Sequence, residues 1–196
     1  MRARIDHWLE RERIRPRTAV SAAGDRRAPA GRPRYKRMKI KIACVGKVKD
    51  GFYRDAVAEY AKRLSRFCAL EIAQVADERA PETLSPAEEA QVKQREGERL
   101  LGRIFAGEFV VCLAVEGKRL GSEAFAQALQ SAFDRAAPCV TFVIGGSLGL
   151  SPAVLGRADL VLSVSDMTLP HGLCRVVLLE QVYRAFKINA REPYHK

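Results

Sequence analysis

Short apolar segments alternate with segments of helical periodicity along most of this chain, and this alternation constrains the fold more than any other feature. The apolar segments are only a few residues long, and the segments between them repeat their apolar residues at helical spacing. Such alternation predicts an α/β fold with a mostly parallel sheet. Because the strands are almost continuously apolar, we expect helices on both faces of the sheet. The expected strands cover residues 39–45, 70–75, 109–115, 139–144 and 159–164.

The helices are expected where start signals precede the periodic segments. Ser85-Pro-Ala-Glu88 has the pattern of a capping box with proline at the first helical position, which predicts a helix from there to about Phe105. Ser122 is expected to cap a helix that ends near Arg135. The remaining helices are expected over residues 52–64, from residue 152, and over residues 172–188.

The last of these helices is apolar over most of its circumference. An ordinary surface helix carries a single apolar stripe, so the broader surface indicates burial on two sides, by the sheet and by a second subunit. Burial in the core of one subunit alone is the alternative. The apolar residues are Leu173, Val176, Val177, Leu178, Leu179, Val182, Tyr183 and Phe186.

Cysteine, histidine and hydropathy patterns exclude several classes of protein. The five cysteines form no C-x-x-C pair and lie mostly in apolar stretches, so we expect reduced, structural thiols. The three histidines lack the spacing of metal ligands, and we expect no metal. No run of 18 apolar residues and no secretory signal is present, which favours a soluble cytoplasmic protein without a membrane partner.

The positive charge of the chain is concentrated at its start. The formal charge is +11, yet residues 38–196 carry 22 basic and 19 acidic residues and are only mildly basic. Residues 1–37 are rich in Arg, Ala, Pro and Gly, a composition typical of disorder. Three interpretations of this extension stay open: upstream sequence translated in error before a true start at Met38, a solvated basic tail, or a targeting segment.

Two glycines follow the first strand, in Gly46-Lys-Val-Lys-Asp-Gly51. A phosphate-binding loop would need lysine and then serine or threonine around the second glycine, whereas Phe52 and Tyr53 follow it here. The G-x-G-x-x-G dinucleotide pattern is also missing. We therefore expect only a strand-to-helix turn with Asp50 at the helix start.

Two loops after the fourth and fifth strands are the strongest candidates for a binding site. The first is Gly145-Gly-Ser-Leu-Gly149, and the second runs from Ser163 to His171. Ligands in parallel α/β folds bind at the carboxyl ends of strands, and glycines let the backbone approach a ligand closely. These loops predict a cofactor held mainly by main-chain atoms. A plain tight turn and local turn-forming side chains such as Asp166 and Thr168 are the alternatives.

The joint occurrence of several motifs resembles the SPOUT methyltransferases, and more narrowly the ribosomal RNA large subunit methyltransferase H family, which methylates N3 of a 23S rRNA pseudouridine. The resemblance covers Met38 to Lys196 and indicates a single domain over these residues. It rests on Lys39-Ile-Lys-Ile-Ala-Cys-Val-Gly-Lys, Pro81-Glu, Ser85, Glu96-Gly, Phe142-Val-Ile-Gly-Gly-Ser-Leu-Gly-Leu, Met167-Thr-Leu-Pro-His, Arg175-Val-Val-Leu-Leu-Glu-Gln-Val-Tyr-Arg-Ala and Pro193-Tyr-His-Lys.

The resemblance implies a C-terminal trefoil knot, a homodimer, S-adenosylmethionine as cofactor and ribosomal RNA of the large subunit as substrate. It also implies that the cofactor lies against the backbone of the knot loops. The positions that match the family's cofactor site are Leu113, Gly145, Val164, Ser165, Asp166, Met167, Thr168 and Leu169.

Catalysis requires that the N3 proton leave, and a general base adds roughly 10²- to 10⁴-fold in rate. The first candidate for base or orienter is His195, with Tyr194 stacking on or orienting the target base, and the second is His171. Arg175 is expected to hold a phosphate or the developing anion. A basic RNA-facing surface is expected on the last helix, from Arg175, Arg184 and Lys187.

Two other functions remain as alternatives. A non-enzymatic RNA- or ribosome-associated factor would keep a basic face and need no cofactor. A dehydrogenase on a doubly wound sheet is disfavoured because the dinucleotide pattern is missing.

Overall fold

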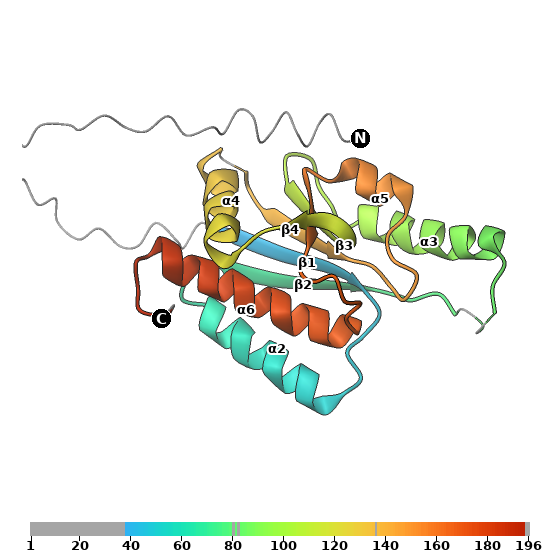
Figure 1. Cartoon of the computed structure of the whole chain (residues 1–196), viewed down its shortest axis with the longest axis horizontal. Helices are drawn as coiled ribbons and strands as arrows, with labels where there is room; N and C mark the ends of the chain where they lie inside the picture. The colour runs from blue at the N-terminus through green and yellow to red at the C-terminus, as the bar shows by residue number, and fades with distance from the viewer. Residues whose placement is uncertain (1–37, 80, 82, 136, 195–196) are drawn as a thin grey trace, which may run out of the picture. The chain divides into compact units, whose positions relative to one another are not determined.

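The computed structural model describes residues 38–79, 81, 83–135 and 137–194, so the expectations for residues 1–37 and for His195 lie outside the described part. Five parallel strands form one sheet in the order β2-β1-β4-β3-β5 (Figure 1). The predicted α/β fold with a parallel sheet is confirmed. The strands are β1 (Lys39–Val45), β2 (Ala69–Val75), β3 (Phe109–Arg119), β4 (Val140–Ile144) and β5 (Leu160–Ser163).

In the described part of the chain, four helices connect the strands and a fifth follows the last strand; their starts follow the expected signals with one exception. The Ser85 capping box is confirmed, because its hydroxyl accepts from the Glu88 N–H and the Glu88 carboxylate accepts from the Ser85 N–H. The prediction that Ser122 is a cap is wrong: Gly121 occupies that position, and the Ser122 hydroxyl donates to Gln181 Oε1 at 3.0 Å instead. The helices are α2 (Gly51–Leu64), α3 (Pro86–Leu101), α4 (Ser122–Asp134), α5 (Pro152–Arg157) and α6 (His171–Asn189).

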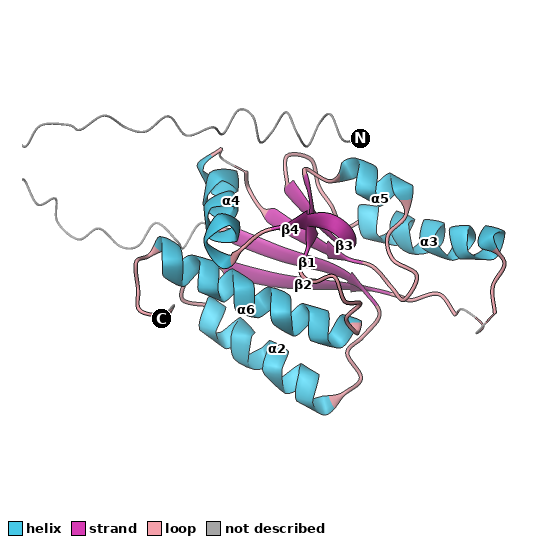
Figure 2. Ribbon diagram, in the orientation of Figure 1, coloured by secondary structure: helices cyan, strands magenta, loops and turns pink. Residues whose placement is uncertain are grey.

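Helices cover both faces of the sheet, as predicted (Figure 2). Alternate residues of β1 point to opposite faces, so Ile40 and Ile42 enter the apolar cluster formed with α2, α4 and α6. Ala43 and Val45 enter a second cluster with α3 and α5. Much of the apolar surface of α6 is buried in the first cluster, while Val176 and Val177 remain half-buried.

The five cysteines are free and buried, as expected from their apolar surroundings. Burial raises the pKa of the Cys68 and Cys112 thiols to about 12, so these thiols stay protonated and unreactive. Within the described residues, no helix combines the length and hydrophobicity that a membrane span requires. No group of three or more His, Cys, Asp or Glu side chains in this part of the chain is arranged to hold a metal ion.

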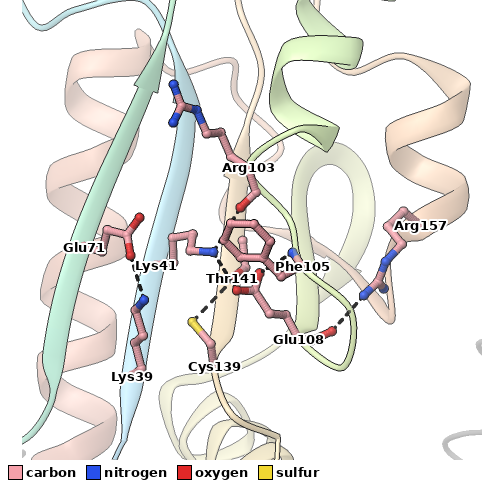
Figure 3. Close-up of polar contacts among 9 residues, drawn as sticks. All are labelled: Lys39, Lys41, Glu71, Arg103, Phe105, Glu108, Cys139, Thr141 and Arg157. Atoms are coloured by element: carbon pink, nitrogen blue, oxygen red, sulfur yellow. Dashed lines mark hydrogen bonds and ion pairs between the residues drawn. The ribbon is translucent and has the colours of Figure 1, made fainter.

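A buried ionic cluster lies near the amino ends of the central strands (Figure 3). Lys41 is 1% exposed, and its Nζ donates to Glu108 Oε1 at 2.5 Å and to the Arg103 carbonyl at 3.0 Å. Thr141 Oγ1 and the Phe105 N–H both donate to Glu108 Oε2, at 2.8 and 3.2 Å. The carboxylate and the ammonium are therefore both hydrogen-bonded, as a buried ion pair requires.

The Glu108 carboxylate should make stability depend on acid pH. Burial by itself raises its pKa, but the hydrogen bonds from Lys41 and Thr141 outweigh burial and hold the pKa below the ordinary value. A depressed pKa gives stability that is present above the unfolded-state pKa of about 4.3 and is lost as the pH falls through the folded-state pKa. We expect the gap in urea midpoint between the unaltered chain and Glu108→Gln to narrow below about pH 4. A gap that stays constant from neutral to strongly acid pH would contradict this assignment.

Candidate active site

The carboxyl ends of β4, β3 and β5 lie side by side and bring the two predicted loops together. Cys112 pairs with both Val143 and Val161, and Leu113 pairs with Leu162. Gly145 and Val164 therefore follow the strands at the same edge, next to Leu113. The predicted cofactor positions thus converge at one place, as expected for ligand sites in parallel sheets.

The glycine loop after β4 is a tight turn that leaves no room for a side chain at Gly145. A Cβ atom on Gly145 would lie 2.7 Å from the Gly149 carbonyl oxygen, and Gly149 has a φ of +87°. The Gly149 N–H donates to the Gly146 carbonyl at 3.2 Å and closes the turn. Glycine is required at these two positions because of close backbone approach and positive φ, and the turn presents main chain rather than side chains.

The loop after β5 is shaped by its own side chains. The Ser163 hydroxyl donates to the Ser165 carbonyl at 2.9 Å, and the Ser165 hydroxyl accepts from the Met167 N–H at 2.9 Å. Asp166 forms an ion pair with Arg119. Met167 is 76% exposed, so its side chain contributes little to the fold of the loop. These contacts fix the course of the backbone while several side chains point to solvent.

β3 continues past the start of this loop and packs closely against it. Lys118 of β3 pairs with Leu162 of β5 after a break in register from Leu113. A Cβ atom on Gly117 would lie 2.5 Å from the Leu162 carbonyl carbon and 2.7 Å from the Ser163 nitrogen. Gly117 is thus a residue of the site's framework that our sequence analysis missed, although a glycine within a strand is a usual sign of close backbone approach.

The Glu96-Gly97 pair on α3 supports the glycine loop from one face of the sheet. Glu96 is 5% exposed, and its Oε1 accepts from the Glu78 N–H at 3.0 Å. Its Oε2 has no hydrogen-bond partner and lies 2.6 Å from where a Cβ atom of Gly146 would stand. Burial, with a smaller contribution from the neighbouring acidic side chains, raises the pKa of Glu96. A Cβ atom on Gly97 would collide with the Ser151 hydroxyl, so this glycine lets α3 approach the start of α5.

A cavity of about 240 Å³ lies beside the second loop, between the start of α4 and the middle of α6. Ligand pockets usually measure roughly 300–1,000 Å³, so this one is too small to enclose a nucleoside-sized cofactor. The cavity can therefore form only a part of the candidate cofactor site. The lining residues include Gly121, Phe125, Ser163, Val164, Val177 and Gln181.

Arg175 lies inside the protein, in the first half of α6. Its side chain is 1% exposed, and Nη2 donates to the carbonyls of Val45 at 2.7 Å and Gly46 at 3.0 Å. Nε and Nη1 have no partner among the described residues. Arg175 therefore joins α6 to the end of β1, and an RNA phosphate cannot reach it in this arrangement.

His171 and Tyr194 lie apart. His171 is exposed, begins α6 and follows the second loop directly. Tyr194 packs against Tyr183 with ring centroids 5.0 Å apart, and its hydroxyl donates to Glu180 Oε1 at 3.3 Å. Glu180 is nine residues along α6 from His171, which corresponds to about 13 Å. Within one subunit, Tyr194 is therefore distant from His171, whereas Glu180, its hydrogen-bond partner, precedes Gln181, which lines the cavity beside Ser163 and Val164.

The sequence profile described as "Predicted SPOUT methyltransferase" matches residues 38–195 of this chain. The chain belongs to the SPOUT methyltransferase family. It is 54% identical over 159 residues to the protein named ribosomal RNA large subunit methyltransferase H of Lactobacillus delbrueckii subsp. bulgaricus, and 55% identical to the protein of that name in Bifidobacterium animalis subsp. lactis. Each alignment covers 81% of this chain and the whole of the relative.

A solved structure of a probable methyltransferase from Bordetella pertussis Tohama I also aligns with this SPOUT chain. The TM-score is 0.45 and the identity 15%, over 78% of this chain and 95% of that one. This likeness is too low to add to the family assignment.

The basic face predicted on the last helix of this SPOUT domain is absent. Arg175 is buried, Arg184 Nη2 bridges Glu180 Oε1 at 2.6 Å, and Lys187 Nζ bridges Glu192 Oε2 at 2.5 Å. The prediction considered only the spacing of the basic residues on α6. Within one subunit these residues form no exposed basic face, because Arg175 is buried and acidic partners pair with Arg184 and Lys187. A basic surface built from both subunits stays a prediction.

Proposed function

We propose that this protein transfers a methyl group from S-adenosylmethionine to N3 of a pseudouridine in large-subunit ribosomal RNA. The observation that carries the proposal is the identity of 54–55% along the full length of relatives named ribosomal RNA large subunit methyltransferase H. The convergence of the two main-chain loops at one edge of the sheet supports it, because this edge is where parallel α/β folds bind ligands.

The residues present fit the proposed cofactor. The turn at Gly145 has no space for a Cβ atom, and the loop from Val164 to Leu169 follows β5 at the same edge of the sheet, with β3 between β4 and β5. Leu113 is buried in β3, just before the break in its register with β5, and would give the cofactor an apolar wall. When bound there, S-adenosylmethionine supplies an electrophilic methyl group on a sulfonium sulfur. Positioning of the acceptor nitrogen can contribute roughly 7–11 kcal/mol at best.

The proton on N3 of the pseudouridine must be removed, and the three candidates differ. Burial, with nearby Tyr60 and Glu180, raises the pKa of Tyr194 to about 12, so in this arrangement its hydroxyl keeps its proton and would donate or orient. His171, exposed beside the second loop, can accept a proton, as can His195. Arg175 has two unpartnered nitrogens, Nε and Nη1, that could stabilise an anion only if α6 and the end of β1 separate.

We further propose a homodimer and a trefoil knot for this domain. The half-buried Val176 and Val177 on α6, next to the cavity beside the second loop, leave apolar surface for a second copy of the chain. Residues 111–113 of β3 pair with β5, and so do Lys118 and Arg119 after a break in register. This double pairing supports a knotted path, because the chain after β5 begins close to the last residues of β3.

Two measurements test the proposed function: calorimetry tests cofactor binding, and nucleoside analysis then tests methyl transfer. We expect the folded protein to bind S-adenosylmethionine and to add one methyl group to ribosomal RNA in assembled particles, detected by mass spectrometry of the nucleosides. Activity on a short naked RNA should be poor, because recognition rests on RNA shape and a splayed loop base. A folded protein that binds ribosomes without binding the cofactor would instead favour a non-enzymatic ribosome-associated factor.

Single-turnover kinetics separate the candidate bases. His195→Ala should lower the methylation rate by roughly 10²- to 10⁴-fold if this histidine takes the proton, while cofactor affinity stays unchanged. His171→Ala is the parallel variant, and the larger loss identifies the base. Unchanged rates in both variants would remove histidine from the chemistry.

A further inference from the structure

The loop between β1 and α2 is fixed beside the candidate active site. A Cβ atom on Gly172 would lie 2.7 Å from Tyr53 Cδ2, so the first turn of α6 packs directly on the start of α2 (Figure 1). Arg175 holds the carbonyls of Val45 and Gly46 from the same helix. Since α6 begins where the second loop ends, the β1–α2 loop lies next to that loop.

The first turn of α2, which follows this loop, carries an exposed aromatic ring, and exposed cations lie in the loop and in the same turn. Phe52 is 66% exposed and rests on Tyr53, with ring centroids 4.1 Å apart and planes inclined by 52°. Lys47, Lys49 and Arg54, within five positions of Phe52 along the chain, are exposed, and Arg54 Nη1 donates to the Lys49 carbonyl at 3.0 Å, which links the loop to the first turn of α2. Asp50 and Asp55 are also exposed, so the net charge of the loop is small and the cations act locally.

A flat ring next to lysines matches the chemistry of an unpaired nucleotide. Unstacked RNA bases stack on aromatic side chains, and the phosphates that follow them bind basic side chains. The cations of α6 are buried or paired, as described above, so they do not compete with this loop as the RNA contact. Exposure of a phenylalanine ring to water is unfavourable, and two thirds of Phe52 is open to solvent.

We infer that Phe52 is a stacking platform for an unpaired base of the substrate RNA, flanking the base that is methylated, and that Lys47 and Lys49 bind the adjacent phosphates. This inference rests on the proposed function, which supplies RNA as the partner. It adds a binding determinant at the β1–α2 loop, which sequence analysis treated as a plain strand-to-helix turn. Phe52 is assigned to RNA affinity and positioning and takes no part in proton or methyl transfer.

Three variants of Phe52 and one control variant of Phe105 test the inference. Binding is measured between the full-length protein and ribosomal particles purified from cells that lack this methyltransferase. Because base stacking contributes about 1–3 kcal/mol, Phe52→Ala should weaken particle binding by about 5- to 150-fold. Phe52→Trp should keep the affinity, and Phe52→Leu should lose it, since leucine retains apolar area without a flat ring. Phe105→Ala is the matched control, because Phe105 is 63% exposed just before β3, near the amino ends of the strands, whereas Phe52 follows the carboxyl end of β1.

The lysines are tested through the dependence of binding on salt. Each of Lys47→Ala and Lys49→Ala should reduce the slope of log K against log salt by about 0.7–0.9. S-adenosylmethionine affinity, measured by calorimetry, should be unchanged in all these variants.

The outcomes separate this inference from the proposed function. Full affinity in Phe52→Leu would indicate an apolar protein partner and overturn the inference, as would full affinity in Phe52→Ala. Either result leaves the proposed function standing if the unaltered protein methylates the particles. Failure of the unaltered protein to bind the cofactor or to transfer methyl groups would instead overturn the proposed function, whatever Phe52 does.

Discussion

Replacement of Lys41 by methionine is expected to lower the free energy of unfolding by about 3–5 kcal/mol, a large share of the total for a domain of this size. The variant leaves the Glu108 carboxylate buried beside Thr141 without its cation. Because an uncompensated buried charge is strongly unfavourable, Glu108 must either take up a proton or admit water. Urea denaturation at neutral pH measures the loss.

Two further variants decide whether the loss comes from the broken pair. Lys41→Met combined with Glu108→Leu should recover most of the stability, because an apolar replacement of a whole buried ion pair is often neutral or stabilising. Lys39→Met is the matched control, since Lys39 and Glu71 form a pair at 2.8 Å with side chains about 43–45% exposed. Such a surface pair contributes less than about 1 kcal/mol. Equal losses in Lys39→Met and Lys41→Met would contradict the role assigned to the buried cluster.

The contrast between these two lysines shows what the sequence could and could not predict. Both occupy alternate positions of an apolar strand, and periodicity correctly predicts that they share one face of β1. Only Lys41 meets Glu108, which is 67 positions away along the chain. The parallel sheet, its helices on both faces and the capping box at Ser85 follow from local patterns, whereas this partner depends on the tertiary fold.

The same distinction applies to the candidate site. The glycines after β4 and the loop after β5 could be predicted, because close backbone approach and turn chemistry leave local signs in the sequence. Burial of Arg175 could not, since its carbonyl partners at Val45 and Gly46 are about 130 residues away. The pairing of Lys187 with Glu192 likewise cancels a charge that helical spacing alone would assign to RNA binding.

Gly145→Ala is expected to weaken S-adenosylmethionine binding by about tenfold to a hundredfold while the protein still folds. The added Cβ atom would lie 2.7 Å from the Gly149 carbonyl oxygen and 2.8 Å from its carbon, so main chain must move. Neither atom belongs to a flexible side chain, and Gly149 is itself held by its bond to the Gly146 carbonyl. Each main-chain hydrogen bond to the cofactor that the displaced loop no longer makes costs about 0.5–1.5 kcal/mol. Calorimetry with the cofactor measures the change.

Gly156→Ala is the control that isolates the geometry of the turn. Gly156 lies in α5, a short helix after the same loop, and a Cβ atom there would meet nothing within 4 Å. Alanine within a helix is favoured over glycine by roughly 0.5–1 kcal/mol, so this variant should be slightly more stable and bind the cofactor normally. If both variants bound the cofactor equally well, main chain at Gly145 would not be part of its site. A loss confined to Gly145→Ala would tie cofactor affinity to the turn after β4, in which a Cβ atom at Gly145 has no space.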